Sequence, residues 1–215
     1  VNPTANGNQG NPAAAFLNDG RMVMVWEDVA EGRTSSVVYG RLYDFDGVPT
    51  GSVFQISNSP PYYTVNNNFP KVAALSGGGF AVVWQYSGSD TMQKDIYLST
   101  FDFSPTLNIV TSNARLTSIT GDQWKPDIAA VTQDNFVVVY MDGAGAAVDI
   151  KLAKYDALGV PATGSIKVET SVDGTLGQLM PRIAAFDGGN KIVVTWCGQG
   201  TADASGKGVY MRCLN

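Results

Sequence analysis

One phrase occurs four times in this 215-residue chain, and that repetition is the feature that most constrains its fold. Aligned on a proline, the copies read "NPAAAFLNDGRMVMVWE", "FPKVAALSGGGFAVVWQ", "KPDIAAVTQDNFVVVYM" and "MPRIAAFDGGNKIVVTWC". The prolines are Pro12, Pro70, Pro126 and Pro181, spaced by 58, 56 and 55 residues. An aromatic residue follows each proline by fourteen or fifteen positions, at Trp26, Trp84, Tyr140 and Trp196. The chain is therefore built from a unit of about 56 residues.

Each unit contains short apolar runs rich in Val, Ile, Tyr and Phe, bounded by turn residues, which is the pattern of β-strands. The first two runs are joined by "NDG", "GGG", "QDN" or "GGN", which suit the positive backbone angles of tight hairpins. No stretch keeps a 3.6-residue apolar period long enough for a helix. We therefore predict a four-stranded antiparallel meander in each unit.

A small sheet with apolar residues on both faces must pack against copies of itself, which favours radial stacking into a β-propeller. A β-sandwich would not keep one residue pattern at so fixed a period. The prediction is one all-β domain over 1–215, with four four-stranded blades at about 1–58, 59–117, 118–170 and 171–215. The last blade lacks its outer strand, so we expect either a ring with a deficient blade or a segment of a larger propeller.

Composition excludes several classes of function. The net charge of −5 provides no basic surface for nucleic acid, and no apolar stretch reaches the roughly 20 residues of a membrane span. The chain begins at Val1, without an initiator methionine, as expected after processing or excision from a longer protein. Few lysines and many Thr, Ser, Asn and Gly suit an extracellular or cell-surface location.

The two cysteines are predicted to be buried free thiols. If the hairpin loop of the fourth unit is centred near residues 202–203, Val193 faces Cys213. Cys197 then lies several residues further along the ladder, beyond the separation that a disulfide tolerates.

The consensus P-x-[VI]-A-A-L-x-[GD]-G-x-x-V-V-V-W resembles repeats of large secreted bacterial proteins, including hemolysin-like and adhesin-like chains. A glutamine three residues before the proline is common in that group, and the chain has Gln9, Asn67, Gln123 and Gln178 there. A Y-D-x-x-G-x-P turn is also shared, as "YDFDGVPTG" and "YDALGVPATG". The resemblance covers essentially the whole chain and implies an exported, non-catalytic module. The glycine-rich nonapeptide calcium motif of those proteins is absent.

Catalysis has little support in the sequence. The chain has no histidine, and it contains no nucleophile elbow, P-loop or HExxH motif. Sialidases are propellers with similar hairpins, but their Asp-box pattern S-x-D-x-G-x-x-W does not occur. We therefore expect a protein that is not an enzyme and carries no cofactor, with a glycosidase-like propeller as a remote alternative.

A ligand site is expected at the face formed by the loops between strands two and three and between neighbouring units. Exposed aromatic rings beside carboxylates are what sugar stacking and hydroxyl bonding require. The alternative is that these rings cap the blade edges. The candidate residues are Trp124, Tyr62, Tyr63, Asp122, Asp28, Asp90 and Asp142.

Other repeated residues are expected to be structural. The aromatic residues Trp26, Trp84, Tyr140 and Trp196 belong to the core, and Gln9, Gln123 and Gln178 tie the entry of the first strand to adjacent backbone. Asp44, Asp102 and Asp156 are expected to accept N–H groups of the following turn. Asp44 and Asp46 have the spacing of a small calcium loop, but they lack the distal glutamate.

The sequence thus predicts a non-catalytic extracellular module that acts by adhesion or as a scaffold. Its partner would be a protein, or another copy bound at the edge of the fourth blade, where an outer strand is missing. The alternative is a carbohydrate-binding lectin that takes a glycan on the loop face.

Overall fold

The computed structural model describes residues 7–58, 65–88, 93–103, 106–117, 120–144, 147–162, 164–169, 177–198 and 208–215. These residues form four antiparallel sheets, each built from strands consecutive in the chain. The prediction of an all-β propeller with four blades is confirmed. The helical content is one short 3₁₀ turn, η1 (Asp187–Gly189), and no helix of the described residues is long and apolar enough to cross a membrane.

The strands of the first two blades are consecutive in the chain, from the inner strand to the outer. Blade 1 consists of β1 (Asn8–Phe16), β2 (Met22–Val29), β3 (Val37–Tyr43) and β4 (Phe54–Gln55). Blade 2 consists of β5 (Asn66–Ala74), β6 (Phe80–Ser87), β7 (Lys94–Phe103) and β8 (Leu107–Arg115).

The last two blades have the same order. Blade 3 consists of β9 (Asp122–Ala130), β10 (Phe136–Ala144), β11 (Ala147–Tyr155) and β12 (Ile166–Lys167). Blade 4 has three strands in the described part of the chain, β13 (Leu179–Phe186), β14 (Lys191–Gly198) and β15 (Gly208–Leu214). The missing outer strand agrees with the sequence prediction.

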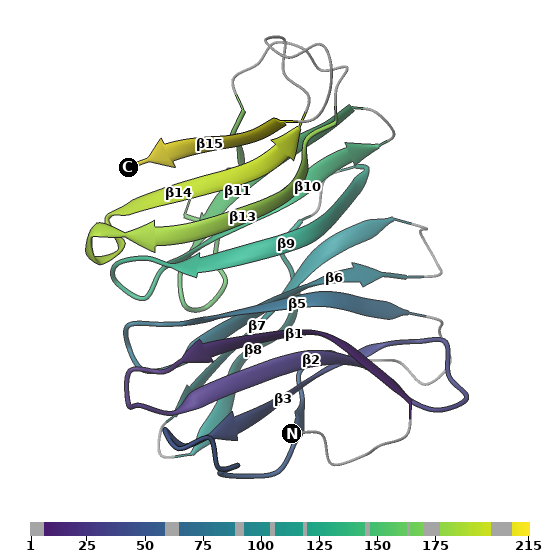
Figure 1. Ribbon diagram of the computed structural model, residues 1–215, viewed down its shortest axis with the longest axis vertical. Coiled ribbons are helices and arrows are strands. Elements are labelled where there is room, and N and C mark those ends of the chain that lie inside the picture. Colours follow the sequence, from purple (N-terminus) through teal and green to yellow (C-terminus); the bar gives the residue numbers. More distant parts are fainter. Residues whose placement is uncertain are drawn as a thin grey trace.

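The four blades follow one another along an arc. Figure 1 shows blade 1 at the bottom and blade 4 at the top, with the inner strands β1, β5, β9 and β13 between them in chain order. β1 packs beside β5, β5 beside β9, and β9 beside β13, whereas no comparable packing joins β1 to β13 among the described residues. The two end blades therefore lie at opposite ends of the molecule.

The core consists of one apolar cluster at each junction between blades. The strand β6 shows why, because its side chains are buried on both faces. Phe80, Val82 and Trp84 pack towards blade 1, and Ala81 and Val83 pack towards blade 3. This alternation of large residues on both faces, expected from the sequence, allows a sheet to lie between two neighbours.

The register in blade 4 confirms one prediction about the cysteines and corrects another. Val193 pairs with Cys213, and Cys197 pairs with Val209 four positions along the ladder, so the two thiols are free. Cys213 is exposed and Cys197 is half-buried, so the prediction of buried thiols was wrong. The reason is that, within the described ranges, no other blade packs on the face of blade 4 that carries them.

Candidate functional site

Each inner strand contains a β-bulge at its aligned proline. The register shifts between Gly10 and Ala13 in blade 1, and equivalent shifts occur in the other three blades. The residue before each proline has a positive φ: 47° at Asn11, 53° at Phe69, 49° at Lys125 and 54° at Met180. Such angles are uncommon outside glycine. Their recurrence at four equivalent positions shows that the bulge is a built feature that re-aims one side chain in each blade.

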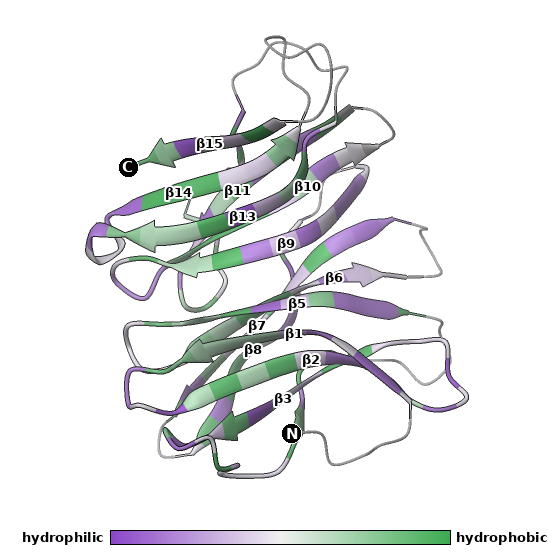
Figure 2. Cartoon of the chain, viewed as in Figure 1, coloured by the Kyte–Doolittle hydropathy of each residue, from purple (hydrophilic) through white to green (hydrophobic). Residues whose placement is uncertain are grey.

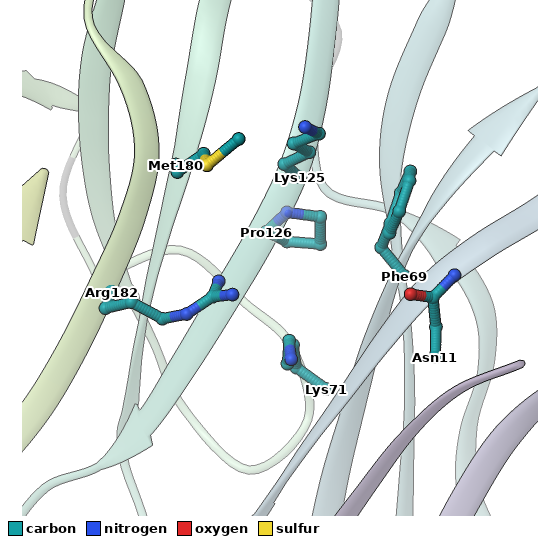
Figure 3. Close-up of a pocket in the computed structure, with 7 residues that line it drawn as sticks. All are labelled: Asn11, Phe69, Lys71, Lys125, Pro126, Met180 and Arg182. Carbon is teal, nitrogen blue, oxygen red and sulfur yellow. The ribbon is translucent and has the colours of Figure 1, made fainter. Parts of the chain in front are cut away.

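The bulges of all four blades line one cavity, which we call the axial cleft. Its volume is about 210 Å³, and its walls come from the four inner strands. Figure 3 shows the side chains converging on it from β1, β5, β9 and β13. The lining residues are Asn11, Phe69, Lys71, Lys125, Pro126, Met180 and Arg182.

The chemistry of the axial cleft differs from that of the whole chain. Three of its seven lining residues are cationic, Lys71, Lys125 and Arg182, although the chain carries a net charge of −5. Phe69 provides an aromatic ring, and the ammonium of Lys125 lies 5.7 Å from the centre of that ring. The cleft therefore combines positive charge with an aromatic surface, and either can contact a ligand.

Asp127 is a carboxyl group beside the axial cleft. It follows Pro126 on β9, and its Oδ2 accepts a hydrogen bond of 3.0 Å from the backbone N–H of Ile183 in blade 4. Burial raises the pKa of the Asp127 carboxyl above its ordinary value, while the Ile183 N–H and the charges of Arg182 and Lys71 oppose that rise. A carboxyl with a raised pKa can hold and donate a proton at a higher pH than an exposed aspartate.

Two other side chains support the bulges from the preceding blade. Glu27 Oε2 on β2 accepts the backbone N–H of Phe69 at 3.1 Å. Gln85 Oε1 on β6 accepts the N–H of Lys125 at 3.3 Å. The positive-φ residues of blades 2 and 3 are thus held by acceptors from their neighbours, which fixes the shape of the cleft.

The carboxylates expected on the loop face have partners within the chain. Asp28 accepts from Gln9 Nε2 at 3.2 Å, and Asp142 accepts from Gln123 Nε2 at 3.0 Å. Asp122 accepts both the backbone N–H and the ammonium of Lys94 and so links blades 2 and 3.

The aromatic residue of that face is also engaged. Trp124 is half-buried against the cluster between blades 3 and 4, and the Lys94 ammonium lies 5.0 Å from its ring centre. Tyr62, Tyr63 and Asp90 lie outside the described residues. The loop-face site therefore stays a prediction.

The aromatic residues of the second strands are buried in every blade, as expected for core residues. The indole N–H of Trp84 donates to Asn67 Oδ1 at 2.9 Å, and that of Trp196 donates to Gln178 Oε1 at 2.8 Å. The residue three before the proline thus pairs mainly with side chains of the second strand. The expected backbone contact occurs at two of these positions: the side-chain amide of Asn67 donates to the carbonyl of Ser36 at 2.9 Å, and that of Gln123 donates to the carbonyl of Gly121 at 3.0 Å.

Two of the three turn aspartates accept N–H groups of the following turn, as expected. Asp44 Oδ1 accepts the N–H groups of Asp46 and Val48, and Asp156 does the same for Leu158 and Val160. Asp102 accepts a hydrogen bond from the side chain of Asn108 at 3.2 Å, and its expected bonds to the turn stay a prediction, because residues 104 and 105 lie outside the described ranges. In the described ranges no group of three or more His, Cys, Asp and Glu side chains could hold a metal ion.

The residues of the axial cleft were not predicted from the sequence. A signal was present, because the positions on either side of each aligned proline vary in charge and size while the rest of the phrase repeats. The bulge that turns these variable residues towards one cavity depends on backbone angles that the repeat pattern does not show.

No protein-family model matches the chain, and no curated sequence matches it. Several solved structures, in contrast, match the chain. The Penicillium chrysogenum alpha-L-arabinanase complexed with arabinobiose matches with a TM-score of 0.66 and 15% identity, over 96% of this chain and 62% of its own. The GH93 alpha-L-arabinofuranosidase of Fusarium graminearum matches with a TM-score of 0.63 and 15% identity, over 98% of this chain and 64% of its own. A Hadza microbial sialidase matches with a TM-score of 0.58 and 11% identity, over 93% of this chain and 44% of its own.

At these identities the likeness establishes the fold alone, and the chain spans less than two thirds of the length of these three structures. The resemblance to secreted repeats holds for the propeller architecture, but the structural neighbours are glycoside hydrolase propellers and not hemolysin-like or adhesin-like repeats. The predictions of a non-catalytic module and of a protein that is not an enzyme are contradicted by these neighbours. The blade phrase could not reveal this, because every propeller needs the same stacked hairpins whatever its site does.

Proposed function

We propose that this chain is a carbohydrate-active propeller of the glycoside hydrolase type, which binds an acidic oligosaccharide in the axial cleft. The observation that carries this proposal is the position of the cleft. It lies where the bulges of all four inner strands meet, and three cations and an aromatic ring line it.

The structural neighbours support the carbohydrate part of the proposal. Two of them act on arabinose-containing glycans and were solved with arabinobiose, and the third is a sialidase, which acts on an acidic sugar. The cations of the cleft favour the acidic class for this chain, because a carboxylate of the sugar can form charge-assisted hydrogen bonds with Lys71 and Arg182.

The remaining groups have roles that follow from their chemistry. The ring of Phe69 gives a sugar an apolar face to stack on, and the amide of Asn11 can bond its hydroxyl groups. Asp127 does not line the cleft itself, but it adjoins the lining residue Pro126, and we propose it as the general acid that protonates the leaving oxygen, a role that its raised pKa suits.

Binding and hydrolysis should be measured separately. Isothermal titration calorimetry would use a sialylated trisaccharide as the acidic probe and arabinobiose as the neutral one, and release of reducing sugar would report cleavage. We expect the acidic probe to bind more tightly, with an affinity that falls as salt rises. Arg182→Ala should weaken it by about tenfold or more, because a charge-assisted hydrogen bond is lost. Lys154→Ala, away from the axial cleft, is the matched control.

The outcomes separate the parts of the proposal. Asp127→Asn should bind the probe normally and lose cleavage. Binding without any cleavage by the unmodified chain would contradict the catalytic role of Asp127, and preference for arabinobiose with no effect of Arg182→Ala would contradict the acidic substrate. Failure of both probes to bind would contradict the cleft as a saccharide site.

A further inference from the structure

The two ends of the blade arc expose faces that the internal blades bury. At every junction, one face of a blade packs on the blade that follows, and we call this its leading face. The opposite face packs on the preceding blade, and we call it the trailing face. In blade 4 the leading face is uncovered, and in blade 1 the trailing face is uncovered, among the described residues.

The leading face of blade 4 is apolar. On β15, Val209 is 80% exposed and Met211 is 64% exposed, and on β13 the ring of Phe186 is 42% exposed. Figure 2 shows apolar residues recurring along β14 and β15, the middle and last strands of blade 4.

The positions equivalent to Val209 are buried in the other three blades. In each blade the repeated aromatic residue of the second strand pairs with a residue of the third strand. The residue one position before that partner in the chain lies on the leading face. In blade 4 this position is Val209, which is 80% exposed. Its counterparts in the other three blades, all with 0% exposure, are Val38, Ile96 and Ile150. Among the described residues, no other blade covers Val209 as one covers its three counterparts, and this accounts for its exposure.

Part of the trailing face of blade 1 has the same character, although Trp26 and Tyr43 on that face are buried. Phe16 on β1 is 72% exposed, and Met24 on β2 is half-buried. The positions equivalent to Met24 are fully buried in the other three blades, at Val82, Val138 and Val194. Methionine side chains adapt to irregular apolar partners, which suits a contact between separate chains.

We propose that the leading face of blade 4 packs on the trailing face of blade 1 of a second copy of this chain. Each internal junction already joins a leading face to a trailing face, so the contact continues an interface that the fold uses three times. It is a head-to-tail contact, and such contacts form a ring when the rotation closes. Because the free faces lie at opposite ends of the arc, two copies joined twice complete eight blades, which lies within the range of known propellers. This inference does not rest on the proposed function.

The test is the mass of the chain in solution, measured by sedimentation velocity at micromolar concentrations. We expect twice the mass of one chain. Met211→Asp on blade 4 and Phe16→Asp on blade 1 should each give monomers, because every contact in such a dimer contains one altered face. Mixing the two variants should restore a dimer through the one junction whose faces are both intact.

Val160→Asp is the control, since Val160 is exposed to 54% in a turn away from both end faces, and it should leave the mass unchanged. Circular dichroism would confirm that all variants keep their strands. A monomeric unmodified chain would overturn the proposal, as would a Phe16→Asp variant that stays dimeric, because the contact would then join two blade 4 faces. Failure of the mixed variants to pair would also overturn it.

Discussion

At the scale of single residues, the chain places strained backbone where its cleft is built. Phe69, Lys125 and Met180 adopt positive φ angles that cost most L residues about 1 kcal/mol or more. Asn11 adopts the same angle, and asparagine tolerates it better. This strain persists because the surrounding bulges fix it, and four of the eight non-glycine residues with positive φ in the described part of the chain line this one cavity.

Asp127 should make the free energy of unfolding depend on pH. Because its pKa is raised in the folded chain, the folded state binds more protons than the unfolded state between the two pKa values. The free energy of unfolding should therefore decrease as pH rises from below the ordinary value of 3.8 through the raised pKa. Asp127→Asn should remove this part of the decrease, while its amide oxygen still accepts the Ile183 N–H.

Urea unfolding at a series of pH values would measure this effect. Val160→Asn, a change at an exposed turn that removes and adds no titratable group, is the control and should follow the pH profile of the unmodified chain. An Asp127→Asn profile that also coincides with the unmodified one would show that Asp127 titrates alike in both states.

At the scale of elements, each blade is a sheet whose inner strand is held by the blade before it. Glu27, Gln85 and Asp127 each accept one backbone N–H of the next inner strand, and at the hairpin end Asn18 donates to the carbonyls of Leu75 and Ser76. Apolar contact gives a junction its free energy, but it does not fix the register between sheets. These directional hydrogen bonds fix the register, because a buried backbone N–H that loses its acceptor raises the free energy of the folded state.

Glu27 allows a matched test of this arrangement. Glu27→Ala should lower the free energy of unfolding by about 1–3 kcal/mol, because the half-buried N–H of Phe69 loses its acceptor. Glu27→Gln should have a much smaller effect, since Gln85 performs the same role at the next junction. Equal losses in the two variants, measured by urea unfolding, would mean that the charge of Glu27 matters and its acceptor role does not.

At the scale of the whole molecule, the blades behave as a one-dimensional stack, because in the described part of the chain the strands of each blade pack mainly on those of the neighbouring blades. Blade 4 has a single junction and three strands among the described residues, whereas blade 3 is covered on both faces. The free energy of local opening should therefore be lower in blade 4 than in blade 3.

Hydrogen exchange in the Met211→Asp variant would show this gradient. The amides of β14 and β15 should exchange through openings of lower free energy than those of β10 and β11, because fewer apolar contacts oppose their opening. In the unmodified chain, the protection of β15 should rise with protein concentration as a second copy covers it. Uniform protection over blades 3 and 4 in the variant would contradict the stack description.

The sequence by itself determined the architecture, because strand periodicity and stacking are local and repeated properties. The spacing of Pro12, Pro70, Pro126 and Pro181 predicted four blades, and the apolar residues on both faces of each unit predicted sheets that pack on both sides, as β6 does. The turn roles of Asp44 and Asp156, and the register that places Val193 opposite Cys213, followed from the same pattern.

The tertiary structure alone decided where the site lies and which faces stay open. Lys71, Lys125 and Arg182 are up to 111 residues apart in the chain, and only the bulges and the order of the blades bring them to one cavity. The exposure of Val209 likewise depends on a neighbour that is missing, which no property of its own strand reveals. A repeat pattern records what each unit needs to fold, whereas a shared cavity and an uncovered end are properties of how the units are arranged.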